Sequence, residues 1–243
     1  MMSQVPDDFQ FGFKVTDTVT VKKFPNLPRF GMKAGAVNAD FLNAELFIDA
    51  FLTQCEVYRD KVGLLMFEFG RFYQTDFAAG KEFVEVLDAF FGKLPKDWPY
   101  GVEMRNRNWL TPEYFSMLSK HGVAHIYNSW THMPAVSEQL KMPGSLTNPR
   151  LTGARFLLTP GATYEKTVKA YSPYRETKQV DEDARIAAAQ LIVGGERYEP
   201  RTKTFVYVNN RLEGNALETI AAMTKAAIEL LDRLIAEKKP QLL

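Results

Sequence analysis

The sequence has little that would point to a secreted, membrane or disulfide-bonded protein. It has one cysteine, Cys55, in 243 residues, so no internal disulfide can form. No apolar run approaches the roughly 18 residues that a membrane span needs. The start, "MMSQVPDDFQ", lacks the basic end and apolar core of a signal peptide. These absences predict a cytoplasmic protein with no membrane partner.

Sequence signatures of metal and cofactor binding are also missing. The chain has three histidines, and it has no HExxH, CxxC, Walker, GxGxxG or GxSxG motif. We therefore expect no metal ligand and no cofactor. The net charge is +1, from 30 basic and 29 acidic residues, which gives no overall field for nucleic acid. A local basic groove would still allow nucleic acid to bind.

Strand-like and helix-like segments alternate along the chain. Strands are predicted by aromatic alternation or by continuous apolar runs, which are typical of parallel sheets. They are expected at residues 9–15, 62–70, 100–105, 123–129, 154–161 and 203–210. Helices are expected at 38–58, 81–94, 111–122, 181–195 and 215–239, with caps at Asn38, Thr111 and Asn215. Asn215 and Glu218 have the spacing of a capping box.

Six strands, each followed by a helix or a long loop, predict a parallel α/β arrangement. We expect a single domain with the fold of a TIM-type (β/α) barrel, incomplete, with about six βα units. Residues 22–37, 131–151 and 161–180 are predicted as long loops. Loops of this length are often functional, and the second and third follow strands.

Four segments carry a resemblance to a known family. "GVEMRNRNWL" at 101–110 resembles the "VEFRHPSW" segment of the DUF72 family, the YecE-like proteins. "FVYVNNRLEGNA" at 205–216 resembles the family's "YVYFNNDAEGNA"-type ending. "VGLLMFEFGRFY" at 62–73 resembles its "LGPLLFQFPPSF" strand and loop, and "VPDDFQFGFKVTDTVT" at 5–20 its "TPEDFRFSVKAPRRIT" entry. The resemblance covers most of the chain. It implies a TIM-barrel-like fold of unestablished biochemical function.

The chain departs from the family pattern in three places. The family's first two strands, of the "GTSGW" and "TVEINSTFY" kinds, have no counterpart, so the barrel is expected to lack them. The family's "YVRLHG" strand becomes "ARFLLTPGA", so its Arg and His are expected to be replaced near Leu158 and Thr159. A histidine of "FRHPSW" becomes Asn106. An activity that uses those groups is in doubt here.

Charged residues at predicted strand ends are the candidates for catalysis. Glu103 and Arg105 lie two apart near the end of a predicted buried strand, so they share a face, and Glu68 closes the preceding strand. Two carboxylates could serve acid–base chemistry. The alternative is a structural ion pair, and the sequence leaves both open.

Ligand-binding candidates are polar or aromatic residues at strand ends and in the following loops. The asparagines near the last strand have an alternative role as helix caps, and the aromatic residues as cover for the barrel top. The candidates are Lys14, Asn106, Trp109, Asn128, Trp130, Tyr164, Tyr174, Asn209, Asn210 and Asn215.

Three functions stay open at this point. One is a hydrolase-like enzyme that acts on a polar or anionic substrate at the carboxyl-terminal mouth of the barrel. Another is a non-catalytic module that binds a ligand or nucleic acid, and the third is a truncated, inactive family member. An open sheet also predicts self-association along its edge strands.

Overall fold

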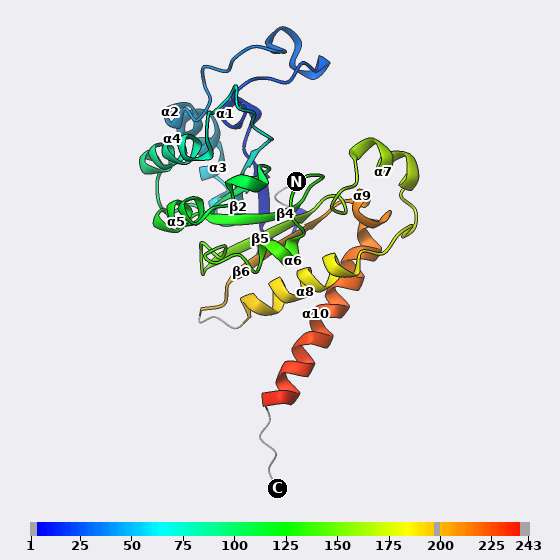
Figure 1. The fold of residues 1–243 in the computed structure, drawn as a ribbon. Coiled ribbons are helices and arrows are strands. Elements are labelled where there is room, and N and C mark those ends of the chain that lie inside the picture. The colour runs from blue at the N-terminus through cyan, green and yellow to red at the C-terminus, as the bar shows by residue number, and fades with distance from the viewer. Residues whose placement is uncertain (1–3, 197–199, 239–243) are drawn as a thin grey trace. The chain divides into compact units, whose positions relative to one another are not determined.

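The computed structural model describes residues 4–196 and 200–238, and it confirms an α/β fold of the TIM-barrel type (Figure 1). Its six strands are all parallel and pair in chain order, from β1 to β6, with β1 and β6 at the ends of that order. Contacts divide the chain into two compact units, Met1–His125 and Ile126–Leu243.

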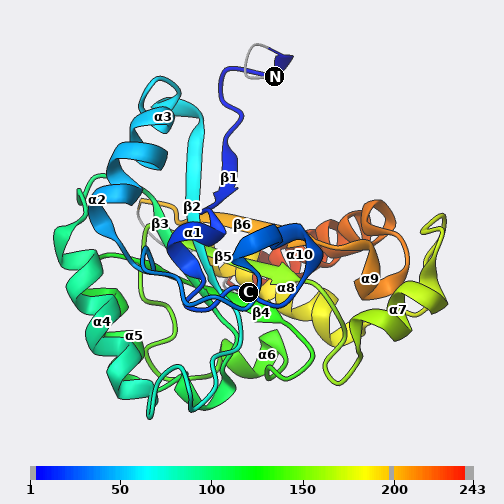
Figure 2. The same cartoon turned by 90° about the horizontal axis from the view of Figure 1, so that it is seen from above.

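The first unit contains strands β1 (Phe11–Lys14), β2 (Val62–Phe69) and β3 (Tyr100–Met104), and β4 (Ala124–Ser129) begins in it. Its longer helices are α4 (Gly80–Lys93) and α5 (Pro112–Lys120), and short helix α1 (Asp17–Thr20) follows β1. Figures 1 and 2 show α4 and α5 side by side along β2 and β3. β2 and β3 match the predicted strands because both are buried along nearly their whole length.

An aromatic core joins β2 to these helices. Phe67 contacts Phe90 and Phe91 of α4 with ring centroids 5.4 Å apart, and Phe69 contacts Phe83 at 5.1 Å. Side chains alternate along a strand. Glu68 therefore lies on the face of β2 opposite to this core, directly beside Glu103 of β3.

The helix predicted at 38–58 begins later than expected and is irregular. It consists of α2 (Ala44–Phe47), a π-helical turn at Ile48–Leu52 and α3 (Thr53–Glu56). The cap is Asn43, whose Oδ1 accepts from the Leu46 N–H at 3.1 Å. Asn38 instead donates to the Thr18 and Val21 carbonyls, so the predicted cap was wrong.

The second unit contains the rest of β4 with β5 (Leu151–Phe156) and β6 (Lys203–Val208). Short helices α6 (Val136–Gln139), α7 (Tyr164–Tyr171) and α9 (Asn210–Glu213) accompany α8 (Glu182–Gly195) and α10 (Ala216–Lys238). Figure 1 shows α8 and α10 next to each other, and their contacts agree. A core that includes Tyr127, Phe156 and Ala188 lies between the strands and these helices.

Three predictions of element positions in this unit need correction, and the first is the predicted loop at 131–151, which contains the short helix α6. The strand predicted at 154–161 is β5, which begins at Leu151 and ends at Phe156, and it pairs with β6 over that range. The predicted loop at 161–180 contains the helix α7, with Thr163 as its cap. Both segments carry turn signals, because Asn148 and Pro149 come just before β5 and Pro160 and Gly161 just before α7.

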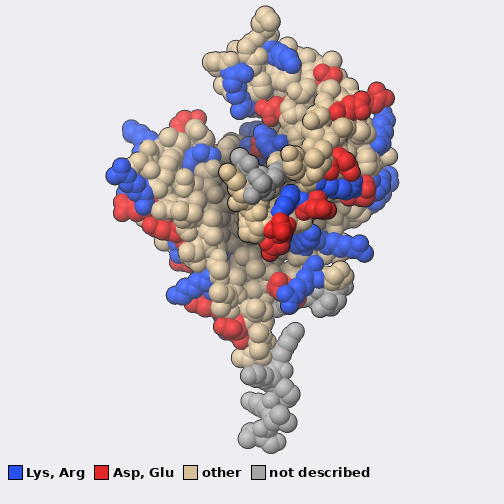
Figure 3. Space-filling view, turned by 180° about the vertical axis from the view of Figure 1, so that it is seen from behind, with Lys and Arg blue, Asp and Glu red and all other residues tan. Residues whose placement is uncertain are grey.

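Among the described residues, none of the helices combines the length and apolarity needed to cross a membrane. Figure 3 shows acidic and basic side chains interspersed over the face that it presents. Local groups of charge therefore matter more for binding than the net charge does.

Candidate functional site

Four predicted site residues of the first unit lie at the carboxyl ends of its strands. Lys14 ends β1, Glu68 is the next-to-last residue of β2, and Glu103 and Arg105 lie at the end of β3. In parallel α/β folds, these ends carry the ligand sites. The structure brings all four together.

These residues form a continuous chain of ion pairs. Arg105 Nε donates to Glu103 Oε1 at 2.8 Å, and its second guanidinium nitrogen lies 3.2 Å from Glu68 Oε2. Lys14 Nζ is 3.3 Å from the other oxygen of Glu68 and 3.2 Å from Asp17. Arg105 is therefore shared by two carboxylates, and Glu68 is bracketed by two cations.

Burial rises along this chain toward β3. The Glu103 side chain is 0% exposed and those of Arg105 and Glu68 are 12% and 14% exposed, whereas Lys14 is 40% exposed. A buried charge is tolerated when it is paired and hydrogen-bonded. The geometry at Glu103 favours a structural ion pair, and Glu68 is the carboxylate nearer to solvent.

Asn106 has a defined structural contact. Its Oδ1 accepts from the Phe72 N–H and its Nδ2 donates to the Phe72 carbonyl, both at 2.9 Å. The amide therefore satisfies both backbone groups of a residue in the loop after β2. Asn106, which was predicted to bind a ligand, therefore holds the loop after β2 in place.

Trp109 reinforces the same loop. Its ring stacks on Phe72 and on Phe83, with centroids 5.6 Å apart in both pairs. Gly80 at the start of α4 leaves room for the indole, because a Cβ there would lie 2.6 Å from the Trp109 ring. Trp109 is thus packed between the loop and α4.

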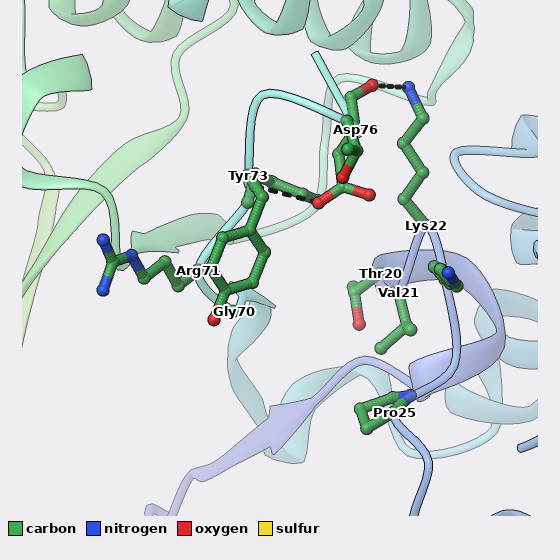
Figure 4. Close-up of a pocket in the computed structure, with 11 residues that line it drawn as sticks. Thr20, Val21, Lys22, Pro25, Gly70, Arg71, Tyr73 and Asp76 are labelled. Carbon is green, nitrogen blue, oxygen red and sulfur yellow. Dashed lines mark hydrogen bonds between the residues drawn. The ribbon is translucent and has the colours of Figure 1, made fainter. Parts of the chain in front are cut away.

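The loops after β1 and β2 line an open cavity of about 510 Å³ (Figure 4). Residues 20–25 form one side and residues 70–76 the other. Its lining includes three basic residues, Lys22, Lys23 and Arg71, and one acidic residue, Asp76. Figure 4 shows Lys22 reaching toward the Asp76 backbone, while Arg71 extends away from Lys22 on the other side of Tyr73.

The groups of this cavity are partly fixed by contacts of their own. The Lys22 ammonium donates to the Asp76 carbonyl and lies 3.4 Å from the centroid of the Phe77 ring. The Asp76 carboxylate accepts from the Tyr73 N–H at 2.9 Å. The Tyr73 ring is 60% exposed, and the Arg71 guanidinium lies 5.4 Å from its centroid.

The sequence analysis did not predict Lys22, Arg71 and Tyr73 as ligand-binding residues. Each follows a strand that was predicted correctly, so the rule that ligand sites form at the carboxyl ends of strands could have found them. What the sequence could not show is that the loops after β1 and β2 face each other across a cavity.

In the second unit, a polar row crosses the sheet. Asn128 of β4 pairs in register with Arg155 of β5, which pairs with Tyr207 of β6. The Tyr207 hydroxyl is buried and has no hydrogen-bond partner among the described residues. Burial raises its pKa to about 12, although the charge of Arg155 opposes this.

Because β5 spans Leu151–Phe156 and not 154–161, an arginine does lie inside this strand, at Arg155. Leu158 and Thr159 follow the strand.

The asparagines after β6 have capping roles. Asn209 accepts from the Arg211 N–H at 3.0 Å and Asn210 from the Ala216 N–H at 2.8 Å. Asn215 accepts from the Leu217 N–H and donates to the Arg175 carbonyl. The Glu218 carboxylate accepts instead from Thr177, so that side chain ties α10 to the loop at 172–181.

Glu213, in the same segment, is fully buried and strongly paired. It binds Arg185 with both oxygens, at 2.9 and 2.8 Å, and also accepts from the Asp181 N–H and the Thr219 hydroxyl. Burial acts to raise the pKa of Glu213, but the hydrogen bonds and the charge of Arg185 outweigh it, and the pKa is lowered. This segment therefore organises the loop that precedes α8.

The remaining aromatic candidates are spread over the second unit. Tyr164 is the first residue of α7, and the Arg211 guanidinium lies 4.6 Å from its ring centroid. Tyr174 has a φ of 65°, which is uncommon for a residue with a side chain. Trp130 follows β4, and its carbonyl accepts from the Met133 N–H.

No group of three or more His, Cys, Asp or Glu side chains in the described part of the chain could hold a metal ion.

The comparisons with known proteins agree with the fold. A family model described as "Protein of unknown function DUF72" matches residues 1–242. The chain belongs to the DUF72 family. A comparison with curated proteins found no match.

Solved DUF72 structures have the same fold. A DUF72 protein from Enterococcus faecalis V583 is 18% identical, with a TM-score of 0.61 over 93% of this chain and 77% of that one. One from Thermotoga maritima MSB8 is 19% identical, with a TM-score of 0.58 over 95% of this chain and 76% of that one. At this identity, the likeness shows the fold alone.

Proposed function

We propose that this DUF72 protein binds a small anionic ligand in the cavity between the loops after β1 and β2. The observation that carries the proposal is the composition of this cavity. Its walls bring three basic residues against one acidic residue, at the end of the strands where ligand sites form. A cavity lined mainly by one sign of charge concentrates the opposite ion.

The single carboxylate of the cavity cancels only part of that charge, because three basic residues line the cavity with it. Asp76 already accepts from the Tyr73 N–H, and its backbone carbonyl accepts from Lys22. Lys22 is held by that bond and by the Phe77 ring, so its ammonium is already in place. A cation that is fixed before binding loses less conformational entropy when the ligand arrives.

Tyr73 suggests the second property of the ligand. Its exposed ring lies beside the Arg71 guanidinium, and an aromatic face next to a cation suits a planar ring. The ligand class is therefore a small anion that carries a ring.

The site supports binding better than carboxylate acid–base chemistry. Glu103 is fully buried and bonded to Arg105, and Glu68 is bracketed by Lys14 and Arg105. A hydrolase-like enzyme would need at least one of these carboxylates to reach a substrate. We therefore favour a ligand-binding function over the hydrolase prediction.

A three-probe panel tests the ligand class. Inorganic phosphate supplies charge alone, adenosine supplies a ring alone, and adenosine 5′-monophosphate supplies both. A ligand that binds the folded state raises the melting temperature. We expect the largest rise with the monophosphate, a smaller one with phosphate, and none with adenosine. Equal rises with adenosine and its monophosphate would contradict an anion site.

A further inference from the structure

Helix α10 (Ala216–Lys238) carries large apolar side chains that no other part of the described chain covers. Leu217 is 79% exposed, Ile228 56% and Ile235 50%. Ile220 and Leu231 are exposed as well. A run of exposed aliphatic side chains on one helix is uncommon for a surface that faces only water.

These side chains are not the ones that anchor α10 to its own unit. The anchoring face packs against Ala189 and Val193 of α8. Its members on α10 are Ala226, Ala227, Leu230 and Leu234. α10 thus has two apolar faces, and α8 covers one of them.

The exposed residues follow a heptad pattern. Leu217, Ala221, Thr224, Ile228, Leu231 and Ile235 are separated by four, three, four, three and four residues, and we name this set the α10 stripe. This is the a/d spacing of a coiled coil, in which the a and d side chains are buried against another helix. In Figure 3 the end of α10, just before the grey residues, presents mostly uncharged surface.

We propose that the α10 stripe is a dimer interface, and that its occupant is α10 of a second copy of this chain in antiparallel orientation. Most homodimers have two-fold symmetry, in which the same patch on both copies is self-complementary. An apolar stripe along a single helix meets this condition, because it can pack against itself.

Charge selects the antiparallel orientation. Lys225 and Asp232 lie one heptad apart along the edge of the stripe, and both are exposed. In a parallel pair, Lys225 would lie beside Ile220 of the other copy and Asp232 beside its Ala227, so neither would meet an opposite charge. In an antiparallel pair centred near Ile228, Lys225 of each copy lies beside Asp232 of the other. This gives two symmetric ion pairs, and such flanking charges set orientation in helix pairs.

This surface lies in the second unit, so the proposal does not depend on ligand binding in the first. It also differs from self-association along the edge strands, because it uses side chains of a helix and not backbone groups of β1 or β6.

Sedimentation velocity over a concentration series tests the interface. The chain is expected to form a dimer. Ile228→Glu is expected to raise the dimer dissociation constant by at least about a hundredfold, because the charge enters the interface twice. Ile186→Glu on α8 is the matched control, since Ile186 is also exposed but lies off α10, and its dimer should be unchanged.

Charge exchange tests orientation separately. Lys225→Asp and Asp232→Lys should each weaken the dimer, and the double variant should restore it. A chain that stays monomeric at every concentration would overturn the proposal. So would a dimer that Ile228→Glu leaves intact. A double variant no stronger than the single ones would overturn the antiparallel pairing.

Discussion

The Asn106 side chain binds both backbone polar groups of Phe72, with the N–H and the carbonyl each 2.9 Å from the amide. Asn106, which follows β3, thereby positions the loop after β2. That loop forms one side of the basic cavity, so the segment at 101–110 contributes to the candidate site through the loop that it supports.

Replacing Asn106 by Leu should remove both bonds while keeping a side chain of similar size. Phe72 is buried, so its backbone groups would lose their partners, at a cost of about 2 kcal/mol in the free energy of unfolding. Asn108→Leu is the control, because Asn108 is exposed, and its effect should stay within about 0.5 kcal/mol. Urea denaturation measures both. Equal losses for the two variants would count against the positioning role.

Arg105→Met should destabilise the protein more than Glu103→Gln. The arginine is shared by two carboxylates, so its loss leaves both without it, at a cost of about 3–5 kcal/mol. After Glu103→Gln, Arg105 keeps Glu68, and we expect a loss nearer about 2 kcal/mol. The double variant should lose less than the sum of the two, because the residues are coupled. A cost under about 0.5 kcal/mol for Glu103→Gln would contradict the buried ion pair.

Glu213 should contribute a pH-dependent part of stability. Its pKa is lowered in the folded protein, so it stabilises the fold above the pKa of an unfolded Glu, about 4.3. That stabilisation is lost as the pH falls through the lower folded-state pKa. The difference in unfolding free energy between the wild type and Glu213→Gln should therefore be full at pH 7 and shrink below about pH 4.3. A difference that does not change with pH would show that the charge of Glu213 is not what stabilises this loop.

Gly214 should tolerate no side chain. Its φ is 115°, and a Cβ there would lie 2.5 Å from the Glu176 carbonyl oxygen and 2.9 Å from the Lys178 nitrogen. Gly214→Ala is expected to cost at least about 2 kcal/mol, from backbone strain together with this contact. Gly194→Ala in α8 is the matched control. No atom of the described residues lies within 4 Å of the position that its Cβ would take, and the substitution should be neutral or stabilising by up to about 1 kcal/mol. Thermal unfolding measures both variants, and the melting temperature should fall for Gly214→Ala and not for Gly194→Ala.

The sequence predicted the regular parts of the fold well. β2 and β3 are buried on both faces, so their apolar runs are continuous, and Thr111 with Pro112 marks the start of α5. The errors fall where polar side chains serve tertiary contacts. Asn38 binds carbonyls in helix α1 and at its end instead of capping a helix, and Glu218 binds Thr177 instead of completing a capping box.

The candidate site was predictable in part. The grouping of Lys14, Glu68, Glu103 and Arg105 follows from the alternation of side chains in parallel strands. The cavity was not predictable in this way, because it depends on how two loops far apart in sequence approach each other. Asn106 and Trp109 were predicted to bind a ligand, and the contacts that the structure gives them are with Phe72 and Phe83.

The most direct test of the binding proposal is calorimetric titration of adenosine 5′-monophosphate into the wild type, Lys22→Met, Arg71→Met and Lys93→Met. Lys93 is an exposed residue of α4 outside the cavity, so its variant controls for the lost charge. We expect Lys22→Met and Arg71→Met each to weaken binding by about tenfold or more, and Lys93→Met to leave it unchanged. Equal affinity in all four proteins, or no binding to the wild type, would contradict the account.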